Sequence, residues 1–426
     1  MLRCALAALL AVAAGSAHAT AGYFQIGYGM KAKGTAGVGI AFPQDALAPA
    51  TNPAGVAKLG NSIQVGLERF YAERGSEIVG NTYPLNGGLN GDRDASDPPA
   101  FWVPEAGATW AATETVSLGF ALFGNGGQTR YAQSPLKALE GSSEPAGMNF
   151  RQGIAAPTLA WRVNERHAVG LALNIVVQEF EAKGFEYFDD PLFTTQPGRV
   201  TNNGTDRSWG VGPRIGWLGQ VTQTVALGAT WQPKIHMTRF DRYEGLLAQH
   251  GTFDVPESYG VGVAWRVTPE LTIAADLMRI EFGGVSSLGA SSSCFMRADR
   301  CRLGADNGPG SGWRDTSVLK VGAAWRASAE WVLRAGIGLL RQPIPPQETL
   351  LNVFAPAVSE RHLAFGASHA FAPGWELSAA YTHAYYNVVH GQDSIPPGDP
   401  PGGIGAGEAN IRMRQRAFGA SITKTF

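Results

Sequence analysis

The sequence predicts an all-β protein: a fourteen-stranded antiparallel transmembrane β-barrel with a glycine-rich N-terminal segment, the hatch, in its lumen. Three observations support this prediction. Only 16% of the 426 residues are charged, against about 25% in a typical soluble domain. Apolar residues alternate with small or polar residues in segment after segment, which is the period of a strand. An aromatic residue, followed by a short turn and a new strand, occurs six times.

Residues 1–19 have the layout of a cleaved secretory signal. Arg3 precedes an apolar run, and Ala17 and Ala19 supply the small side chains of a cleavage site. We expect cleavage after Ala19, which removes Cys4 with the signal. No later run of 18 or more residues is continuously apolar, so a helical membrane protein is not expected. The mature chain is therefore soluble in the periplasm, secreted, or a barrel.

Residues 20–60 differ from the rest of the mature chain. They contain eight glycines, three prolines and the turn Asn52-Pro53-Ala54-Gly55, and they lack both a helical stripe and a clean alternation. A compact, mostly uncharged segment directly behind an export signal suits the inside of a tube. A disordered leader is the alternative. We expect residues 20–60 to form the hatch and residues 61–426 to form the barrel with its long extracellular loops.

Three segments illustrate the alternation. In each, apolar side chains occupy every second position and small or polar residues lie between them. In a soluble sandwich the apolar face would be the core, whereas in a membrane barrel it faces lipid. The apolar faces are formed by Val169, Leu171, Leu173, Ile175 and Val177; by Leu271, Ile273, Ala275 and Leu277; and by Trp375, Leu377, Ala379 and Tyr381.

The repeated turns favour the membrane barrel. Successive turns lie 46 to 60 residues apart, so each interval holds two strands and one long loop. Short turns at one rim, long loops at the other and an aromatic girdle are typical of outer-membrane barrels. The turns are marked by Trp110 before Val116, Trp161 before Val169, Trp217 before Val225, Trp265 before Leu271, Trp325 before Trp331, and Phe371 before Trp375.

The strand count follows from these turns. Six short turns join twelve strands, and an opening strand over residues 62–72 and a closing strand over residues 412–426 make fourteen. The first long loop is expected over residues 73–102. The closing strand ends on Phe426, and a terminal aromatic residue resembles the signal read by the barrel assembly machinery, which we therefore expect as a partner.

Two cysteines remain in the mature chain, Cys294 and Cys301, in a polar loop. Oxidising conditions outside the cytoplasm favour a disulfide between them. A metal site is the alternative, but it lacks nearby His or Cys partners. Neither a cofactor nor a metal is predicted from any motif in the chain.

The chain resembles the FadL-type outer-membrane transporters of long-chain fatty acids and aromatic hydrocarbons over essentially its whole mature length. Each motif alone is weakly specific, and their order and spacing carry the resemblance. The motifs are Asn52-Pro53-Ala54, Val255-Pro256-Glu257 before Tyr259-Gly260, Gly312-Trp313-Arg314-Asp315-Thr316, Trp331-Val332-Leu333-Arg334-Ala335-Gly336, and Gln342-Pro343-Ile344-Pro345.

The resemblance implies capture of a hydrophobic ligand by the outer loops and its sideways release through a gap where the third strand is kinked. That strand is expected over residues 116–131 and contains Gly124, Asn125, Gly126 and Gly127. Three glycines in four positions favour a bulge that interrupts the ladder. The alternative is that these residues begin the outer turn.

Candidate ligand contacts lie in the hatch and in two loops, although packing within the protein is the alternative role for each of them. A fatty-acid carboxylate would also require a basic partner. The apolar candidates are Tyr23, Phe24, Ile26, Tyr28 and Met30 in the hatch, Leu136 and Leu139 in one loop, and Leu246, Leu247 and Phe253 in another loop, where a short amphipathic helix is an option. The basic candidates are Arg130, Lys234, Lys320 and Arg334.

Together with these features, the resemblance implies an outer-membrane protein that takes up hydrophobic molecules, with long-chain fatty acids favoured over aromatic hydrocarbons. Its surroundings would be outer-membrane lipid and lipopolysaccharide. A diffusion porin or an adhesin is the remaining non-enzymatic reading. An enzyme is not expected, because the mature histidines show no grouping with a serine. A net charge of −1 gives no basic face for nucleic acid.

Overall fold

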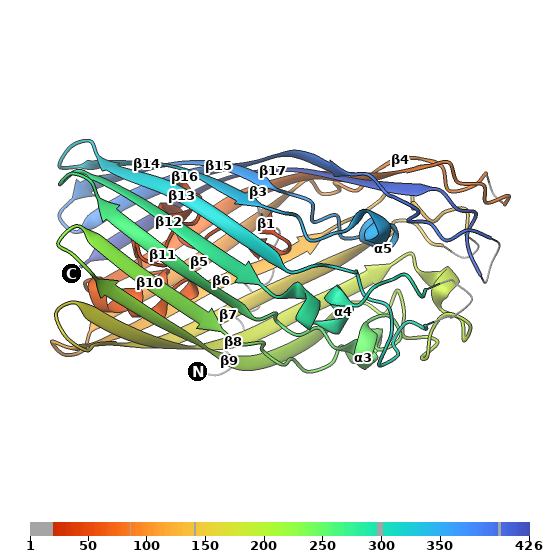
Figure 1. Cartoon of the computed structure of the whole chain (residues 1–426), viewed down its shortest axis with the longest axis horizontal. Helices are drawn as coiled ribbons and strands as arrows, with labels where there is room; N and C mark the ends of the chain where they lie inside the picture. Colours follow the sequence, from red (N-terminus) through yellow and green to blue (C-terminus); the bar gives the residue numbers. More distant parts are fainter. Residues whose placement is uncertain (1–19, 86, 140–141, 296–300, 399–401) are drawn as a thin grey trace.

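The computed structural model describes residues 20–85, 87–139, 142–295, 301–398 and 402–426. The expected signal peptide lies outside the described residues. Fourteen antiparallel strands form a closed barrel, in which the last strand, β17, pairs with the first, β3 (Figure 1). The prediction of a fourteen-stranded barrel is confirmed. Within the described ranges, no helix is long and apolar enough to cross a membrane.

The barrel strands lie next to one another in sequence order, apart from β4, a short extra strand that pairs with the outer part of β3. They are β3 (Ser62–Val79), β5 (Ala100–Ala111), β6 (Val116–Gln128), β7 (Gly147–Arg162), β8 (His167–Lys183), β9 (Asp206–Gln220), β10 (Val225–Gln232), β11 (Ser258–Arg266), β12 (Leu271–Ile280), β13 (Thr316–Arg326), β14 (Trp331–Leu340), β15 (Arg361–Ala372), β16 (Trp375–Val389) and β17 (Glu408–Thr425), with β4 at Gly91–Asp94.

The remaining elements are short. The hatch contains a two-stranded hairpin and three helical turns, and the outer loops contain the others. They are β1 (Thr20–Ala21), β2 (Phe24–Gln25), α2 (Met30–Gly34), η1 (Ala48–Ala50), η2 (Pro53–Lys58), η3 (Glu186–Phe188), η4 (Asp241–Tyr243), α3 (Ala248–Gly251), η5 (Phe282–Gly284), α4 (Ser286–Gly289), η6 (Pro346–Glu348) and α5 (Thr349–Asn352).

All six short turns are present where the sequence predicts them, between β5 and β6 and at the five later hairpins of the same rim. Aromatic side chains beside these turns face outward; Trp110 and Trp325, for example, are about half exposed. The outward positions between the two rims are mainly aliphatic. This is the apolar band with flanking aromatic residues that a lipid-facing wall requires.

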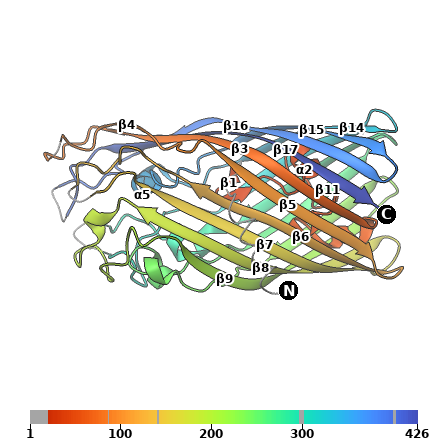
Figure 2. The ribbon, with the colours of Figure 1, turned by 180° about the vertical axis from the view of Figure 1, so that it is seen from behind.

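The first and last strands are longer than expected. β3 continues to Val79 and β17 begins at Glu408, so the loop predicted over residues 73–102 is partly strand. These strands and β4 extend beyond the rest of the wall at the loop end (Figures 1 and 2). The extension is polar on its outer side, where Arg414 pairs with Glu73 across the two strands. Such cross-strand ion pairs stabilise a sheet outside the apolar layer, where hydrophobic alternation is no longer a guide.

The hatch lies inside the barrel. Helix α2 packs against β14, β15 and β16, and η2 packs against β6 to β9. The wall approaches closely because it carries glycine at the contact: a Cβ on Gly170 would lie 2.3 Å from the backbone of Pro53. Asn52 fixes this end of the hatch, since its Nδ2 donates to the carbonyls of Ile40 (2.7 Å) and Trp217 (2.9 Å).

Candidate functional site

The wall has an open edge on β6. This strand pairs with β5 only as far as Leu122, which lies opposite Ala106, whereas its ladder with β7 runs in register from Val116 to Gln128. Residues 123–128, here called the open edge, therefore lack a β5 partner among the described residues. The expected bulge is not found in the β6–β7 ladder, and the interruption lies on the β5 side instead. The strand also ends at Gln128, three residues earlier than expected.

The hatch hairpin covers the open edge. The N–H of Gly126 donates to the carbonyl of Tyr23 (3.1 Å), and Gln25 Nε2 donates to the carbonyl of Gly124 (2.5 Å). Asn125 Oδ1 accepts from the Gln25 N–H (3.2 Å) and from the Tyr28 hydroxyl (2.7 Å). The residues predicted to form a kink thus form the contact between hatch and wall. The hatch hairpin supplies hydrogen bonds to backbone groups of the open edge that lipid could not satisfy.

The two hatch tyrosines remain neutral. Burial raises the pKa of Tyr28 to about 12 and raises the pKa of Tyr23 well above its usual value. Both phenols are therefore protonated at physiological pH, and Tyr28 acts as a hydrogen-bond donor to Asn125.

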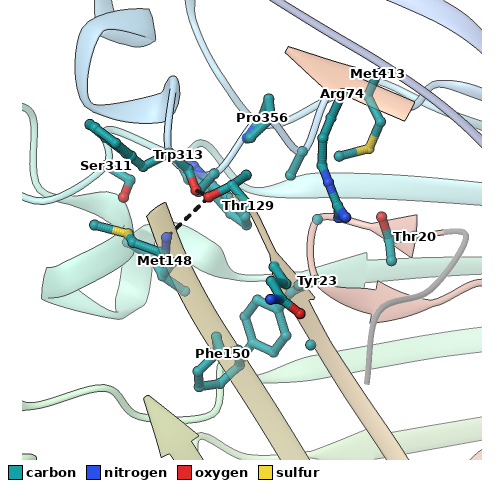
Figure 3. Close-up of a pocket in the computed structure, with 18 of the residues that line it drawn as sticks. Thr20, Tyr23, Arg74, Thr129, Met148, Phe150, Ser311, Trp313, Pro356 and Met413 are labelled. Atoms are coloured by element: carbon teal, nitrogen blue, oxygen red, sulfur yellow. Dashed lines mark hydrogen bonds between the residues drawn. The ribbon is translucent and has the colours of Figure 1, made fainter. Parts of the chain in front are cut away.

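A cavity lies on the loop side of the hairpin (Figure 3). Its volume is about 130 Å³. Gly126 and Gly127 of the open edge form part of its wall. The large apolar side chains that line it include Tyr23, Phe70, Phe150, Phe180, Leu247, Phe253, Trp313 and Phe354.

Aromatic rings from three parts of the chain meet in this cavity. The ring of Tyr23 lies edge-on to Phe150 of β7, with centroids 5.1 Å apart, and Phe150 lies 4.7 Å from Phe253 of an outer loop. Tyr23 also lies 6.1 Å from Phe253. Hatch, wall and loop therefore share one aromatic surface, so a movement of the hairpin would change the shape of the cavity.

Arg74 is the one strongly basic side chain of the described residues that line this cavity. It extends from β3 toward Thr20 and is 4% exposed (Figure 3). Its guanidinium lies 5.3 Å from the ring centroid of Phe101, and its Nε and Nη2 have no hydrogen-bond partner among the described residues. A buried cation with free donors is costly unless an anion joins it.

Sequence reasoning missed Arg74 because it ended the opening strand at residue 72. The signal was the alternation itself: Phe70, Ala72 and Arg74 occupy every second position of β3 and are all buried. Had the strand been extended by two residues, Arg74 would have been placed on the inner face.

The apolar candidates are divided among several spaces. Tyr23, Leu247 and Phe253 line the cavity on the loop side of the hairpin. The remaining candidates lie elsewhere. Phe24, Ile26 and Tyr28 line a smaller space on the other side of the hairpin, Leu246 lines a space beneath the outer loops, and Met30, Leu136 and Leu139 are buried in packing.

The basic candidates are also dispersed. Arg130 is wrong as a lumen residue: it is half exposed and pairs with Asp97 at 3.2 Å, because β6 ends before it and the alternation no longer applies. Lys234 donates to the carbonyl of Gly284 near the surface. Lys320 is buried in the smaller space, where its Nζ is 3.3 Å from the carbonyl of Gly37. Arg334 binds Gln44 and Ser368.

Two loop features complete the site. Cys294 and Cys301 are joined by a disulfide, with Cα atoms 5.4 Å apart. The short α3 element is not an amphipathic helix, because Gln249 and His250 have left-handed backbone angles. The apolar residues of this loop could be identified from the sequence, whereas the left-handed turn at Gln249 and His250 could not. No group of His, Cys, Asp and Glu that could bind a metal occurs within the described ranges.

Comparison with known proteins agrees with this geometry. A family model described as outer membrane protein transport protein (OMPP1/FadL/TodX) matches residues 10–397. The chain belongs to this family. It is thus an outer-membrane transport protein for hydrophobic molecules, as the sequence predicted. No curated protein matches the chain.

Solved structures share the fold of this OMPP1/FadL/TodX protein at low sequence identity. A Pseudomonas aeruginosa FadL homologue is 17% identical with a TM-score of 0.72, covering 95% of this chain and 100% of that one. The Pseudomonas putida toluene transporter TodX is 15% identical with a TM-score of 0.65, covering 94% and 99%. The Ralstonia pickettii toluene transporter TbuX is 17% identical with a TM-score of 0.63, covering 94% and 98%.

Proposed function

We propose that this protein takes up long-chain fatty acids. The observation that carries the proposal is Arg74, a buried guanidinium with free donors in a cavity whose lining is otherwise uncharged and mostly apolar. A carboxylate would satisfy these donors through charge-assisted hydrogen bonds, and the aromatic side chains would contact the acyl chain. A neutral hydrocarbon would leave the cation without a partner.

The proposed route leads from the outer loops into the cavity and then out through the wall. The cavity borders the open edge at Gly126 and Gly127, where the hatch hairpin takes the place of β5. If the hairpin moves, the ligand reaches lipid through this edge without crossing the aqueous periplasm. The hatch residues 20–60 would then control both the volume of the cavity and its exit.

Aromatic hydrocarbon uptake is the second candidate. The rings of Tyr23, Phe150 and Phe253 lie within 4.7 to 6.1 Å of one another and would stack on a small aromatic ligand. Toluene transporters also share the fold, although at this sequence identity that likeness does not indicate a substrate.

The test is displacement of a fluorescent long-chain fatty acid from the purified protein in detergent. We expect oleate to displace the probe and an alkylbenzene or oleyl alcohol to displace it weakly. Arg74→Met should raise the Kd for oleate at least tenfold, because hydrogen bonds to charged groups contribute about 1.5–3 kcal/mol and about 1.4 kcal/mol is tenfold.

Arg130→Met serves as the control, since Arg130 is half exposed and paired with Asp97; it should leave the Kd unchanged. Displacement by the alkylbenzene alone would favour the hydrocarbon reading. If oleate binds the Arg74→Met variant as tightly as the wild type, the role given to Arg74 is wrong.

A further inference from the structure

A cluster of arginines faces outward from the wall near the loop end. Its members are Arg69 on β3, Arg361 on β15, and Arg414 and Arg416 on β17, here called the arginine patch. On β17 the outward side chains toward the short-turn rim are Phe418, Ala420 and Ile422, and on β3 they are Leu67, Val65 and Ile63. The arginine patch therefore begins where the apolar band of the wall ends.

The arginine patch has fewer carboxylates than cations. Glu73 contacts both Arg414 and Arg416, the latter at 3.6 Å. Among the described residues, Arg69 and Arg361 have no carboxylate within salt-bridge distance and lie against aromatic rings instead. Arg69 lies 4.9 Å from the Trp102 ring centroid, and Arg361 lies 6.0 Å from that of Tyr385.

One ring brings two of these cations together. The guanidinium carbons of Arg69 and Arg416 lie 5.7 Å and 5.6 Å from the centroid of Tyr71. Both side chains lie on the outer face of the barrel, and the side chain of Arg416 is 55% exposed. Two like charges thus share one aromatic neighbour at the membrane boundary, beside a tyrosine and a tryptophan of the kind that occupies the headgroup level.

The arginines on the opposite wall near the loop end have carboxylate partners. There Arg151 and Arg207 share Glu179, and Arg279 contacts both Glu281 and Asp315. Farther toward the loops on the side of the patch, Arg412 pairs with Asp92. Arg69 and Arg361 thus differ from these arginines, each of which contacts a carboxylate.

We infer that the arginine patch binds the phosphate groups of lipopolysaccharide in the outer leaflet. The long loops mark the extracellular end of an outer-membrane barrel, so the patch lies at the height of outer-leaflet headgroups. Guanidinium groups pair with phosphate through two parallel hydrogen bonds, and basic clusters beside the apolar layer attract anionic lipids. The acyl chains of the same lipid would lie along Leu67 and Phe418.

The patch also adjoins the proposed exit. Trp102 belongs to β5, in the part of that strand that no longer pairs with β6. A lipopolysaccharide molecule bound through Arg69 would therefore stand beside the open edge on its outer-leaflet side.

The test is native mass spectrometry of the full barrel, purified in detergent and freed of lipid, after addition of lipid A with both phosphates. We expect one bound copy. The same lipid without phosphates should bind at least tenfold more weakly, and so should phosphatidylglycerol. The variant R69Q/R416Q should lose at least tenfold in lipid A occupancy, whereas the control R151Q/R207Q on the opposite wall should match the wild type.

Three results would overturn the inference. They are equal binding of lipid A with and without phosphates, equal binding by R69Q/R416Q and the wild type, and a dimer that disappears in R69Q/R416Q, which would make this face an interface between copies. Heat-dependent migration on gels checks that the variant is folded. If it is not, the comparison of phosphorylated with dephosphorylated lipid on the wild-type protein still decides the question.

Discussion

Gly126 and Gly127 differ in what a side chain would meet. Gly126 has a φ of 149°, a conformation that favours glycine, and its N–H binds the Tyr23 carbonyl of the hatch. At Gly127 a Cβ would meet no atom within 4 Å. The first glycine is therefore required by the backbone, whereas the second leaves open the space between the cavity and the proposed exit.

This difference predicts two distinct phenotypes. Gly126→Val should strain the backbone by about 1–3 kcal/mol and lower the melting temperature. Gly127→Val should leave stability unchanged but reduce fatty-acid uptake by cells several-fold, because its side chain fills the space beside the open edge. Uptake and thermal unfolding of both variants check this. Normal uptake by Gly127→Val would remove the open edge from the transport route.

At the scale of single residues, the sequence predicted side-chain direction wherever the strand bounds were right. The face formed by Val169, Leu171 and Leu173 points outward as expected. Arg130 and Arg74 were misplaced for one reason, the position of a strand end. Outside the apolar layer, the position at which a strand ends depends on polar cross-strand pairs such as Arg414 with Glu73. The alternation of apolar and polar residues does not reveal these pairs.

Among the elements, helix α2 shows how the hatch is attached to the wall. Lys33 is buried, and its Nζ lies 3.0 Å from Glu68 and 3.3 Å from Glu105. Burial alone lowers the pKa of Lys33, but the two carboxylates raise it above its usual value. The contribution of Lys33 to the free energy of unfolding is therefore fully present below the pKa that this amine has in the unfolded chain. It is lost as pH rises through the higher pKa of the folded protein. At physiological pH, Lys33 is protonated and attaches the hatch to the wall as a cation.

Replacing this amine should loosen the hatch. Lys33→Met removes the cation between two buried carboxylates, which typically costs about 3–5 kcal/mol. We expect a folded barrel with new, fluctuating ion conductance in planar bilayers. Lys58→Met is the control, because Lys58 is exposed and reaches only the carbonyl of Glu165 at 3.4 Å. A silent Lys33→Met channel would show that other contacts suffice to fix the hatch.

Contacts of this kind could not be read from the sequence. The six hairpin turns follow from local patterns, and all are present. In contrast, Lys33 contacts Glu105, and Tyr28 binds Asn125. These partners lie far apart in the sequence, so neither a helical nor a strand periodicity relates them. The glycines and prolines of residues 20–60 set this segment apart from the strands, but its orientation depends on the inner face of the closed wall, which exists only once all fourteen strands are paired.

For the whole molecule, wall and hatch differ in what each needs to fold. The wall closes through its own ladder, from β3 to β17, so the first and last strands leave no sheet edge along their seam that lipid would have to satisfy. Its inner face is rich in polar residues such as Gln152, Gln178, Asp276 and Lys320, which water can solvate. The wall should therefore be stable without the hatch, whereas the hatch has little secondary structure of its own.

Deleting residues 20–58 while keeping the signal sequence tests this division. We expect a barrel that still shows heat-dependent migration on gels, because wall pairing is intact. It should gain a steady ion conductance, since the lumen fills with water, and lose saturable fatty-acid uptake, since Tyr23 and the cover of the open edge are gone. Bilayer recordings and an uptake assay measure both effects. If the deletion yields a folded barrel without new conductance, the loops alone close the pore and the hatch does not control passage.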